Sequence, residues 1–445
     1  MKNLKIRLLD RLEQEFALTA GQIKRFIKDF HFQMNKGLAG EKSSLEMLPA
    51  FVDRPSGKEK GRFIALDLGG TNLRLLQLEL KGSGRIEKLA ERKFVLKEKY
   101  IKGKGKDLFD FIAGCIKRFV QEKGIAGTKK SDIGFTFSFP IRQASITSGV
   151  LMYWTKGFCA KGVVGKDVVG LLNRALAEKG LYNIKVAALA NDTVGTLVAR
   201  AYRESECDIG AIFGTGTNAC YREKISRILK MKGRKTKGSH MIINTEWANF
   251  NKINTTVYDR ILDKNSINPG EHILEKMISG MYLGEIARLV MLDLIKRGVL
   301  FNSKLPQALR VPRVFKTEYM SYIAADRTVG LVKTNSLLRK LGIKDSCCQD
   351  RQVVKKICNF ISGRAACLSA AALAAIILKI DPDLSRRHTV AVDGTVYEKY
   401  PGFANGINAC LKRIFAKKSS KIKISLTKDG SGIGAAIIAA VTDEN

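Results

Sequence analysis

The sequence predicts an α/β protein made of two related lobes, each a small sheet with helices packed against it. Runs with strand-like apolar patterning alternate with helical runs along most of the chain. Residues 63–202 are predicted to fold as three strands followed by alternating helices and strands, and a second cycle begins at residue 209. Each cycle contains an apolar strand that ends in a glycine turn, at 67–72 and at 213–218. The repeated turn indicates that one unit has been duplicated.

The first half of the chain contributes a helical lead-in and the first lobe. Residues 4–38 carry apolar side chains at helical spacing, and Pro55-Ser56-Gly57 interrupts that pattern. Beyond it the apolar period shifts to that of strands, with turns at 69–70 and 81–84. We expect strands at 63–68, 73–80, 92–96, 133–139 and 186–189, and helices at 107–120, 167–179 and 193–202.

The second half repeats the alternation and adds a long helical insertion. We expect strands at 209–213, 219–223, 241–245, 389–392 and 422–426, and helices across 271–379, at 403–415 and at 432–441. These elements predict four parts of the chain. They are an N-terminal helical segment packed on the large lobe (1–62), the small lobe (63–192), the large lobe (193–430), and a C-terminal helix that returns to the small lobe (431–445).

The composition is that of a globular protein. The 445 residues are 45% apolar, enough to bury a large core in two or three domains. No apolar run approaches the ~20 residues of a membrane-spanning helix, and residues 1–10 lack the apolar core of a secretory signal, so we expect no membrane span and a cytoplasmic location. The nine cysteines form no C-x-x-C pair and the four histidines have no metal-ligand spacing, which predicts reduced thiols and no protein metal site.

The chain carries a formal net charge of +35, which raises nucleic acid, an acidic surface or an anionic substrate as candidate partners. The lysines are spread from Lys2 to Lys428, with local clusters at 102–106, 230–237 and 412–423. No recognised nucleic-acid module accompanies them. A solvated basic surface is the favoured interpretation, and we expect no specific nucleic-acid partner.

The two glycine turns are suited to holding phosphate. Each follows an apolar strand, and glycine lets backbone N–H groups approach a phosphate without obstruction. A hairpin turn that needs glycine for its backbone angles explains either turn alone, but their repetition favours a triphosphate held between the lobes. The chain contains no G-x-x-x-x-G-K-[ST] loop, which excludes P-loop chemistry.

A third glycine segment, residues 430–435, satisfies G-x-G-x-x-[GA] at the start of a predicted helix. Fifteen residues follow Gly430, so neither a further strand nor an acidic residue about twenty positions on is expected, and a dinucleotide fold is not predicted. We expect instead a phosphate or nucleotide contact at a helix N-terminus, where amide groups and the helix dipole favour anions. Tight packing of the helix is the alternative.

Short polar side chains are predicted at strand ends, as a polyol-binding site requires. Carboxylates and amides hydrogen-bond vicinal hydroxyls, and a site built from them rejects analogues that lack the hydroxyls. The candidates are Ser138, Thr155, Lys156, Asn191, Asp192, Asn218, Glu246 and Glu275.

Asp192 follows a predicted strand at the start of a predicted helix, so helix capping is one interpretation of it. Catalysis is compatible with that, since phosphoryl transfer to a sugar hydroxyl needs a carboxylate to accept the proton and cations to neutralise the phosphate. Asp192 would provide the carboxylate and Lys156 part of the positive charge. Mg²⁺ would provide more, held mainly by substrate phosphates and water, with Asp67 as its outer-shell carboxylate.

These segments together resemble the eukaryotic-type hexokinase and glucokinase family, from about residue 45 to residue 441. The matching segments occur in the family's order. They are Phe63 to Arg74, Gly134 to Pro140 with Gln143, Trp154 to Phe158, Asn191 to Thr196, Gly214 to Tyr221, Asn244 to Trp247, Asn268 to Gly270 followed by Glu275 to Met277, and Val392 to Pro401.

The resemblance implies a two-lobed actin-like ATPase fold, a duplicated ribonuclease H-like unit, with an active-site cleft between the lobes. It implies a hexokinase, monomeric or weakly dimeric, that uses ATP and Mg²⁺ to phosphorylate the 6-hydroxyl of glucose and related hexoses. Asp192 would be the base with Lys156 beside it, and the eight polar candidates would contact the sugar. The implied ATP contacts are Asp67, Gly69, Gly70, Thr71, Asn72, Arg74, Thr215, Gly280, Thr317, Ser321, Gly430 and Ser431.

The chain departs from the family's pattern after Trp247, where Ala248-Asn249-Phe250 replaces the usual Gly-Ala-Phe, so we expect the sugar-facing loop to differ. Residues 331–356 are basic and match poorly. Two other interpretations stay open. One is a sugar sensor or nucleic-acid-associated regulator that keeps the fold, and the other is a kinase for mannose, fructose or an amino sugar. The presence of Asp192 and Lys156 favours an enzyme over a sensor.

Overall fold

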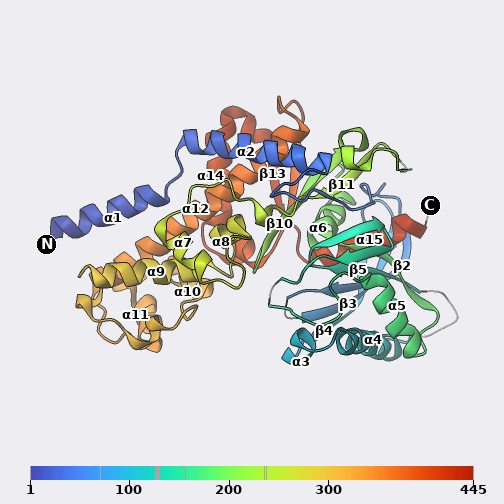
Figure 1. The fold of residues 1–445 in the computed structure, drawn as a ribbon, viewed down its shortest axis with the longest axis horizontal. Helices are drawn as coiled ribbons and strands as arrows, with labels where there is room; N and C mark the ends of the chain where they lie inside the picture. The colour runs from blue at the N-terminus through green and yellow to red at the C-terminus, as the bar shows by residue number, and fades with distance from the viewer. Residues whose placement is uncertain are drawn as a thin grey trace.

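The computed structural model describes residues 2–70, 72–125, 131–155, 157–234, 236 and 238–443, and two sheets organise them into two lobes (Figure 1). The small-lobe sheet contains β2 (Lys60–Leu68), β3 (Asn72–Lys81), β4 (Ile86–Val95), β5 (Ser131–Phe137) and β8 (Ile184–Ala190). The large-lobe sheet contains β1 (Leu48–Pro49), β9 (Cys207–Phe213), β10 (Thr217–Lys224), β11 (His240–Asn244), β12 (His388–Asp393) and β13 (Ile422–Leu426).

The two sheets have the same topology. The strand order is β4-β3-β2-β5-β8 in one and β11-β10-β9-β12-β13 in the other, with β1 added at the edge beside β11. In both sheets three strands that are consecutive in the chain pair antiparallel as a meander. The next strand, β5 or β12, pairs parallel to the first strand of the meander, and the last, β8 or β13, pairs parallel to that strand. The strands of the two sheets have the same order and the same relative directions, which confirms the predicted α/β fold made of two related lobes.

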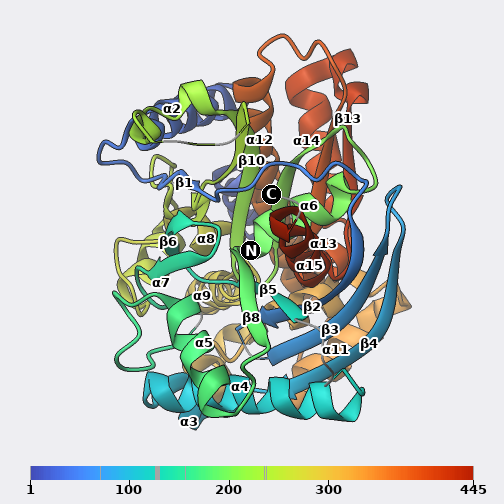
Figure 2. The same ribbon diagram turned by 90° about the vertical axis from the view of Figure 1, so that its right-hand side faces the viewer.

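Helices cover both faces of the small-lobe sheet. Alternate residues of a strand point to opposite faces, so the apolar side chains of one strand pack against helices on both sides. Ile64 and Leu66 of β2 belong to a core closed by α4 (Gly105–Glu122) and α5 (Val168–Glu178), which Figure 2 shows against the sheet. Phe63 and Ala65 point the other way and pack with α15 (Gly430–Asp443). The short helix α3 (Glu98–Lys102) and the hairpin β6 (Ile141–Ser145) and β7 (Ser148–Leu151) complete this lobe.

Two helices lie between the sheets and hold them together. Helix α6 (Asp192–Ala201) packs on α15 and on β9, and α15 packs on the small-lobe sheet. A Cβ atom on Gly434 of α15 would lie 1.9 Å from the carbonyl oxygen of Gly195 in α6, and one on Gly210 of β9 would lie 2.4 Å from the carbonyl oxygen of Thr193. Glycine is therefore required on both sides of α6, which fixes the position of the residues at its start.

The other face of the large-lobe sheet is covered by helices around α12 (Cys348–Ile380), which contacts α2 (Ala20–Ala39), α9 (Leu283–Lys296) and α14 (Phe403–Phe415). The predicted helical lead-in is two helices, because α1 (Lys2–Phe16) ends before Thr19 caps α2. The predicted insertion is likewise divided into several helices. The remaining helices are α7 (Val257–Lys264), α8 (Ile273–Ile278), α10 (Thr317–Ala325), α11 (Val332–Lys340) and α13 (Thr395–Lys399).

Within the described residues, α12 is the one helix whose length and apolar composition would suffice to cross a membrane. However, 83% of its most apolar window is buried inside the protein. Its apolar side chains belong to the large-lobe core, so it has the character of a core helix.

A buried ion pair joins α12 to α7. The two terminal guanidinium nitrogens of Arg364, Nη1 and Nη2, donate to Asp259 at 2.6 and 2.7 Å, and both side chains are at most 5% exposed. Burial alone would raise the pKa of Asp259, but Arg364 and the hydrogen bonds from Thr256 lower it instead. The ionised pair is thus matched in geometry as well as in charge.

We expect Asp259→Ala to lower the free energy of unfolding by about 3–5 kcal/mol, because it leaves Arg364 charged and unpaired in the core. Urea unfolding followed by circular dichroism measures this. Glu98→Ala, which removes an exposed pair with Lys102, is the control and should cost less than about 1 kcal/mol. Equal losses in the two variants would contradict the account of the buried pair.

Candidate active site

A cleft of about 420 Å³ lies between the lobes. Its lining residues follow strands β2, β5, β8, β9 and β12, so the carboxyl ends of strands from both sheets meet here. Ligands bind at this edge of α/β sheets because the loops after the strands converge there. The predicted site residues that line the cleft are Asp67, Gly69, Gly70, Ser138, Thr155, Asn191, Asp192, Thr215, Asn218, Glu246, Glu275 and Ser431.

Both glycine turns present backbone to the cleft. In the first turn, Gly69 N donates to Asn72 O at 3.0 Å. In the second, Gly214 N donates to Gly216 O at 3.0 Å, and Gly280 N donates to Gly214 O at 2.8 Å from the adjoining loop. Two glycine turns, one from each lobe and each closed by a backbone hydrogen bond, suit a chain of phosphates that extends across the cleft.

The start of α15 adjoins the first turn. Ser431 Oγ donates to Asp67 Oδ2 at 2.8 Å, and both side chains line the cleft. A helix N-terminus favours an anion, because its first N–H groups and its dipole are directed at the ligand. The close approach at Gly434 supports the packing interpretation of residues 430–435. Ser431 lines the cleft, and the phosphate or nucleotide contact stays a prediction.

Asp192 is the first residue of α6, directly after β8. The residue that caps the helix is Asn191, whose Oδ1 accepts from Thr193 N at 3.0 Å. Asp192 Oδ1 also accepts from Thr193 N, at 2.9 Å, and its half-buried side chain lines the cleft. The capping function predicted as an alternative for Asp192 thus belongs mainly to its neighbour, and Asp192 is held at the cleft.

Amides and carboxylates on the large lobe form a connected cluster. Asn218 Nδ2 donates to Glu246 Oε1 at 3.0 Å and to Asn244 Oδ1 at 2.8 Å, and Asn244 Nδ2 donates to the same Glu246 oxygen at 2.7 Å. Thr217 N donates to Glu275 Oε2 at 3.0 Å. These bonds orient the side chains before any ligand arrives, and the set is chemically suited to hydroxyl groups.

Sequence reasoning missed His272 and Asp393, which also line the cleft. Burial would lower the pKa of His272, but Glu275 and Glu246 raise it above its usual value. Burial raises the pKa of Asp393, and the charge of Asp192 adds to that effect. Asp393 belongs to a segment that resembles the family and could have been found from it, whereas nothing local marked His272.

Some predicted contacts are not among the residues that line the cleft. Lys156 and Thr71 lie outside the described residues. Thr317 Oγ1 accepts from Gly284 N at 2.9 Å, and Ser321 Oγ donates to Lys399 O at 3.3 Å. The described residues among the predicted ATP contacts that do not line the cleft are Asn72, Arg74, Gly280, Thr317, Ser321 and Gly430.

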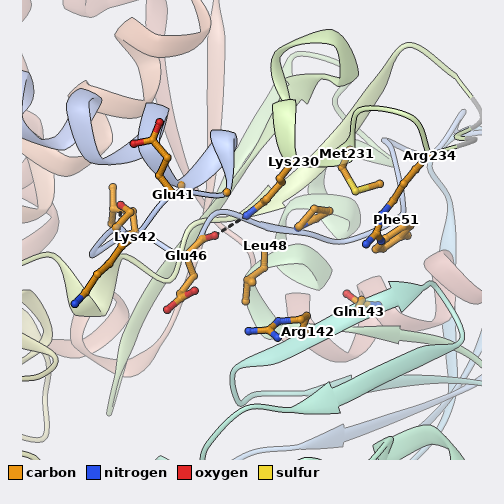
Figure 3. A pocket seen from close by; sticks show the side chains of 15 residues that line it. Glu41, Lys42, Glu46, Leu48, Phe51, Arg142, Gln143, Lys230, Met231 and Arg234 are labelled. Carbon is orange, nitrogen blue, oxygen red and sulfur yellow. Dashed lines mark hydrogen bonds between the residues drawn. The ribbon is translucent and has the colours of Figure 1, made fainter.

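A second cavity, of about 440 Å³, lies where the segment after α2 meets β6 and residues 230–234 (Figure 3). Lys230 Nζ donates to Glu46 O at 2.7 Å (Figure 3). Burial lowers the pKa of Lys230 to about 8, and Arg142 adds to this while Glu46 opposes it. Neither glycine turn and no part of α6 lines this cavity, so we assign the chemistry to the cleft between the lobes.

Two duplicated lobes, a pair of glycine turns suited to phosphate and a polar cluster suited to hydroxyl groups are the features expected of a sugar kinase. Two family models, both described as Hexokinase, match residues 8–202 and 208–441. Hexokinase-2 of Oryza sativa subsp. japonica is 41% identical over 97% of this chain and 90% of its own length. Hexokinase HKDC1 of Homo sapiens is 40% identical over 97% of this chain, which spans 48% of that protein.

The solved structures agree with the sequence comparison. The hexokinase from Schistosoma mansoni complexed with glucose has a TM-score of 0.91 and 35% identity to this chain, covering 99% of it and 100% of that chain. Another hexokinase crystal structure has a TM-score of 0.82 and 33% identity, covering 99% and 100%. The chain belongs to the hexokinase family, the enzymes that transfer a phosphoryl group from ATP to a hexose.

Proposed function

We propose that this hexokinase phosphorylates the 6-hydroxyl of glucose, and of related hexoses, with Asp192 as the general base. The position of Asp192 supports this most directly, because it lines one cleft with both glycine turns and with the cluster of Asn218 and Glu246. A carboxylate in such a place can take the proton of the attacking hydroxyl. The glucose bound to the S. mansoni hexokinase supports the choice of sugar.

Different residues of the cleft bind the sugar, bind the phosphates and accept the proton. Asn218, Glu246 and Glu275 bind and orient the sugar hydroxyls, while backbone N–H groups of the two turns and the start of α15 bind the phosphates of ATP. Asp192 accepts the proton of the 6-hydroxyl as its oxygen attacks the γ-phosphorus, and ADP departs with the electrons of the broken P–O bond. The resemblance assigns Lys156 the role of offsetting negative charge on the transferred group.

Mg²⁺ belongs to this proposal as the ion that accompanies ATP. The residues of the cleft fit it, because Asp67 and Asp393 both line the phosphate end. Burial and the carboxylates of Asp429 and Asp192 raise the pKa of Asp393, and a cation nearby would relieve that accumulation of negative charge. When bound, Mg²⁺ would neutralise the phosphates, with Asp67 acting through water.

The direct test is an assay of the purified chain with MgATP and glucose, mannose, fructose and glucosamine, read as ADP formed. We expect turnover with glucose and weaker or equal turnover with sugars that differ at C2. A chain that forms ADP with none of these sugars would exclude the proposed reaction. A chain that prefers another hexose would correct the substrate and keep the reaction.

We expect Glu246→Gln to raise the KM for glucose by about 10- to 100-fold. The amide is neutral and has one acceptor oxygen instead of two, so it can keep the bonds from Asn218 and Asn244 only by presenting a donor in place of the other carboxylate oxygen. Hydrogen bonds to charged groups contribute about 1.5–3 kcal/mol. Steady-state kinetics at saturating ATP measures this change. The KM for ATP should stay near that of the unmodified chain, and an equal rise in both constants would argue against a role specific to the sugar.

A further inference from the structure

We propose that Tyr153 and Asn249 form a latch between the two loops that contact the sugar, and that both are positioning residues for hexose binding. Asn249 Nδ2 donates to Tyr153 Oη at 3.0 Å. Tyr153 lies two residues before Thr155, on the loop that follows β7, and Asn249 lies three residues after Glu246. One hydrogen bond therefore joins the loop with Thr155 to the loop with Glu246. The inference rests on the proposed function, which places the sugar between these loops.

Each half of the latch is fixed to the core of its own lobe by a tryptophan. Trp154 Nε1 donates to Ala160 O at 2.9 Å, and its ring packs against Phe139 beside the small-lobe core. Trp247 Nε1 donates to Thr217 Oγ1 at 2.9 Å, and the ring is buried in the large-lobe core. Because both loops are anchored separately, the bond between them sets the distance across the cleft rather than the fold of either loop.

The latch is connected to the predicted sugar-binding carboxylate Glu275 through His272. The ring of Tyr153 meets that of His272 edge-on, with centroids 6.0 Å apart and planes at 84°. His272 Nδ1 lies 3.5 Å from Glu275 Oε1. Burial raises the pKa of Tyr153 and the charge of Glu246 raises it further, so the phenol keeps its proton and accepts from Asn249 as a neutral group.

The latch depends on a residue that departs from the family's pattern. Asn249 stands where the family usually has alanine in Gly-Ala-Phe, and alanine has no side-chain donor for Tyr153. The Asn249→Ala variant therefore restores the family's residue at this position and removes the hydrogen bond. Replacing Asn249 by the residue usual in the family therefore tests the latch.

A sugar that needs groups from both loops binds more tightly when the loops are already held at the right separation. Tyr153→Phe and Asn249→Ala each remove the same neutral hydrogen bond. From the usual contribution of such a bond, each variant should raise the dissociation constant for glucose by about 3- to 10-fold. The double variant should be no weaker than either single variant, since all three lose the same bond. The kcat and the KM for ATP should stay near those of the unmodified chain.

Glucose binding can be followed by tryptophan fluorescence without ATP, because the two tryptophans of the chain flank the latch. Tyr182→Phe is the matched control, since Tyr182 is 83% exposed, and it should leave glucose binding unchanged. Unchanged binding in both latch variants would overturn the proposal. So would additive losses in the double variant, or a parallel rise in the KM for ATP.

The same titration separates the latch from the proposed function. The latch is measured as the ratio of glucose dissociation constants between variants and the unmodified chain, with no turnover required. The proposed function is measured as sugar phosphate formed by the unmodified chain. If the unmodified chain binds glucose but forms no sugar phosphate, the proposed reaction fails, and the ratio for the variants still decides the latch.

Discussion

Asp192→Asn should lower kcat by about 10²- to 10⁴-fold while glucose affinity changes little, because an amide cannot accept the proton of the attacking hydroxyl. The substitution preserves the local structure. An asparagine oxygen can still accept from Thr193 N, as Asp192 Oδ1 does at 2.9 Å, and Asn191 still caps α6. Steady-state kinetics with glucose and MgATP measures kcat, and tryptophan fluorescence measures glucose binding.

Asp345→Asn removes a carboxylate from an exposed loop and is the control for this substitution, with kcat expected to remain unchanged. If Asp192→Asn retained kcat within a few-fold of the unmodified chain, the general base would have to be another group. If Asp192→Asn lost glucose binding as completely as turnover, the loss of a sugar contact would explain the lost activity, and a role as general base would not be supported.

Gly434→Ala should lower the free energy of unfolding by about 3 kcal/mol or more. The added Cβ would lie 1.9 Å from the carbonyl oxygen of Gly195, a backbone atom that cannot move aside without separating α15 from α6. Since α6 begins at Asp192, the surviving folded protein should also lose activity. Thermal and urea unfolding, together with kcat, report the two effects.

Gly114→Ala is the matched control, because Gly114 lies within helix α4 and a Cβ there would meet no heavy atom within 4 Å. It should stabilise the protein by about 0.5–1 kcal/mol, as expected when alanine replaces glycine inside a helix. Opposite signs for the same substitution at 114 and 434 are the predicted result. Equal gains in stability would mean that α6 and α15 can move apart at no cost.

The fold could be predicted from the sequence where a strand is a continuous run of apolar residues and where glycine marks a turn. Strand β9 is buried at nearly every residue, and its apolar run predicted it directly. Strand β4 was expected only from residue 92, because half of its ten residues are charged and it lies at the edge of its sheet. The hairpin of β6 and β7 was not expected, since its strands are short and form a separate two-stranded sheet.

The candidate site was predictable where one short segment supplied both position and chemistry. Asn191-Asp192 after β8 and Asn218 after the second glycine turn are of this kind. His272 and the pair of Tyr153 with Asn249 could not be found in this way, because their surroundings come from segments distant in sequence. Asn249 was marked as a departure from the family, but its partner became visible only when the two lobes were placed together.

The central claim is that this cleft transfers phosphate to the 6-hydroxyl of a hexose with Asp192 as the base. Phosphorus and proton NMR of the product formed from glucose and MgATP tests it most directly, run in parallel with the unmodified chain and with Asp192→Asn. We predict glucose 6-phosphate as the sole sugar phosphate from the unmodified chain and only a trace from the variant. Phosphate on another hydroxyl, free phosphate without sugar phosphate, or equal product from both proteins would contradict the account.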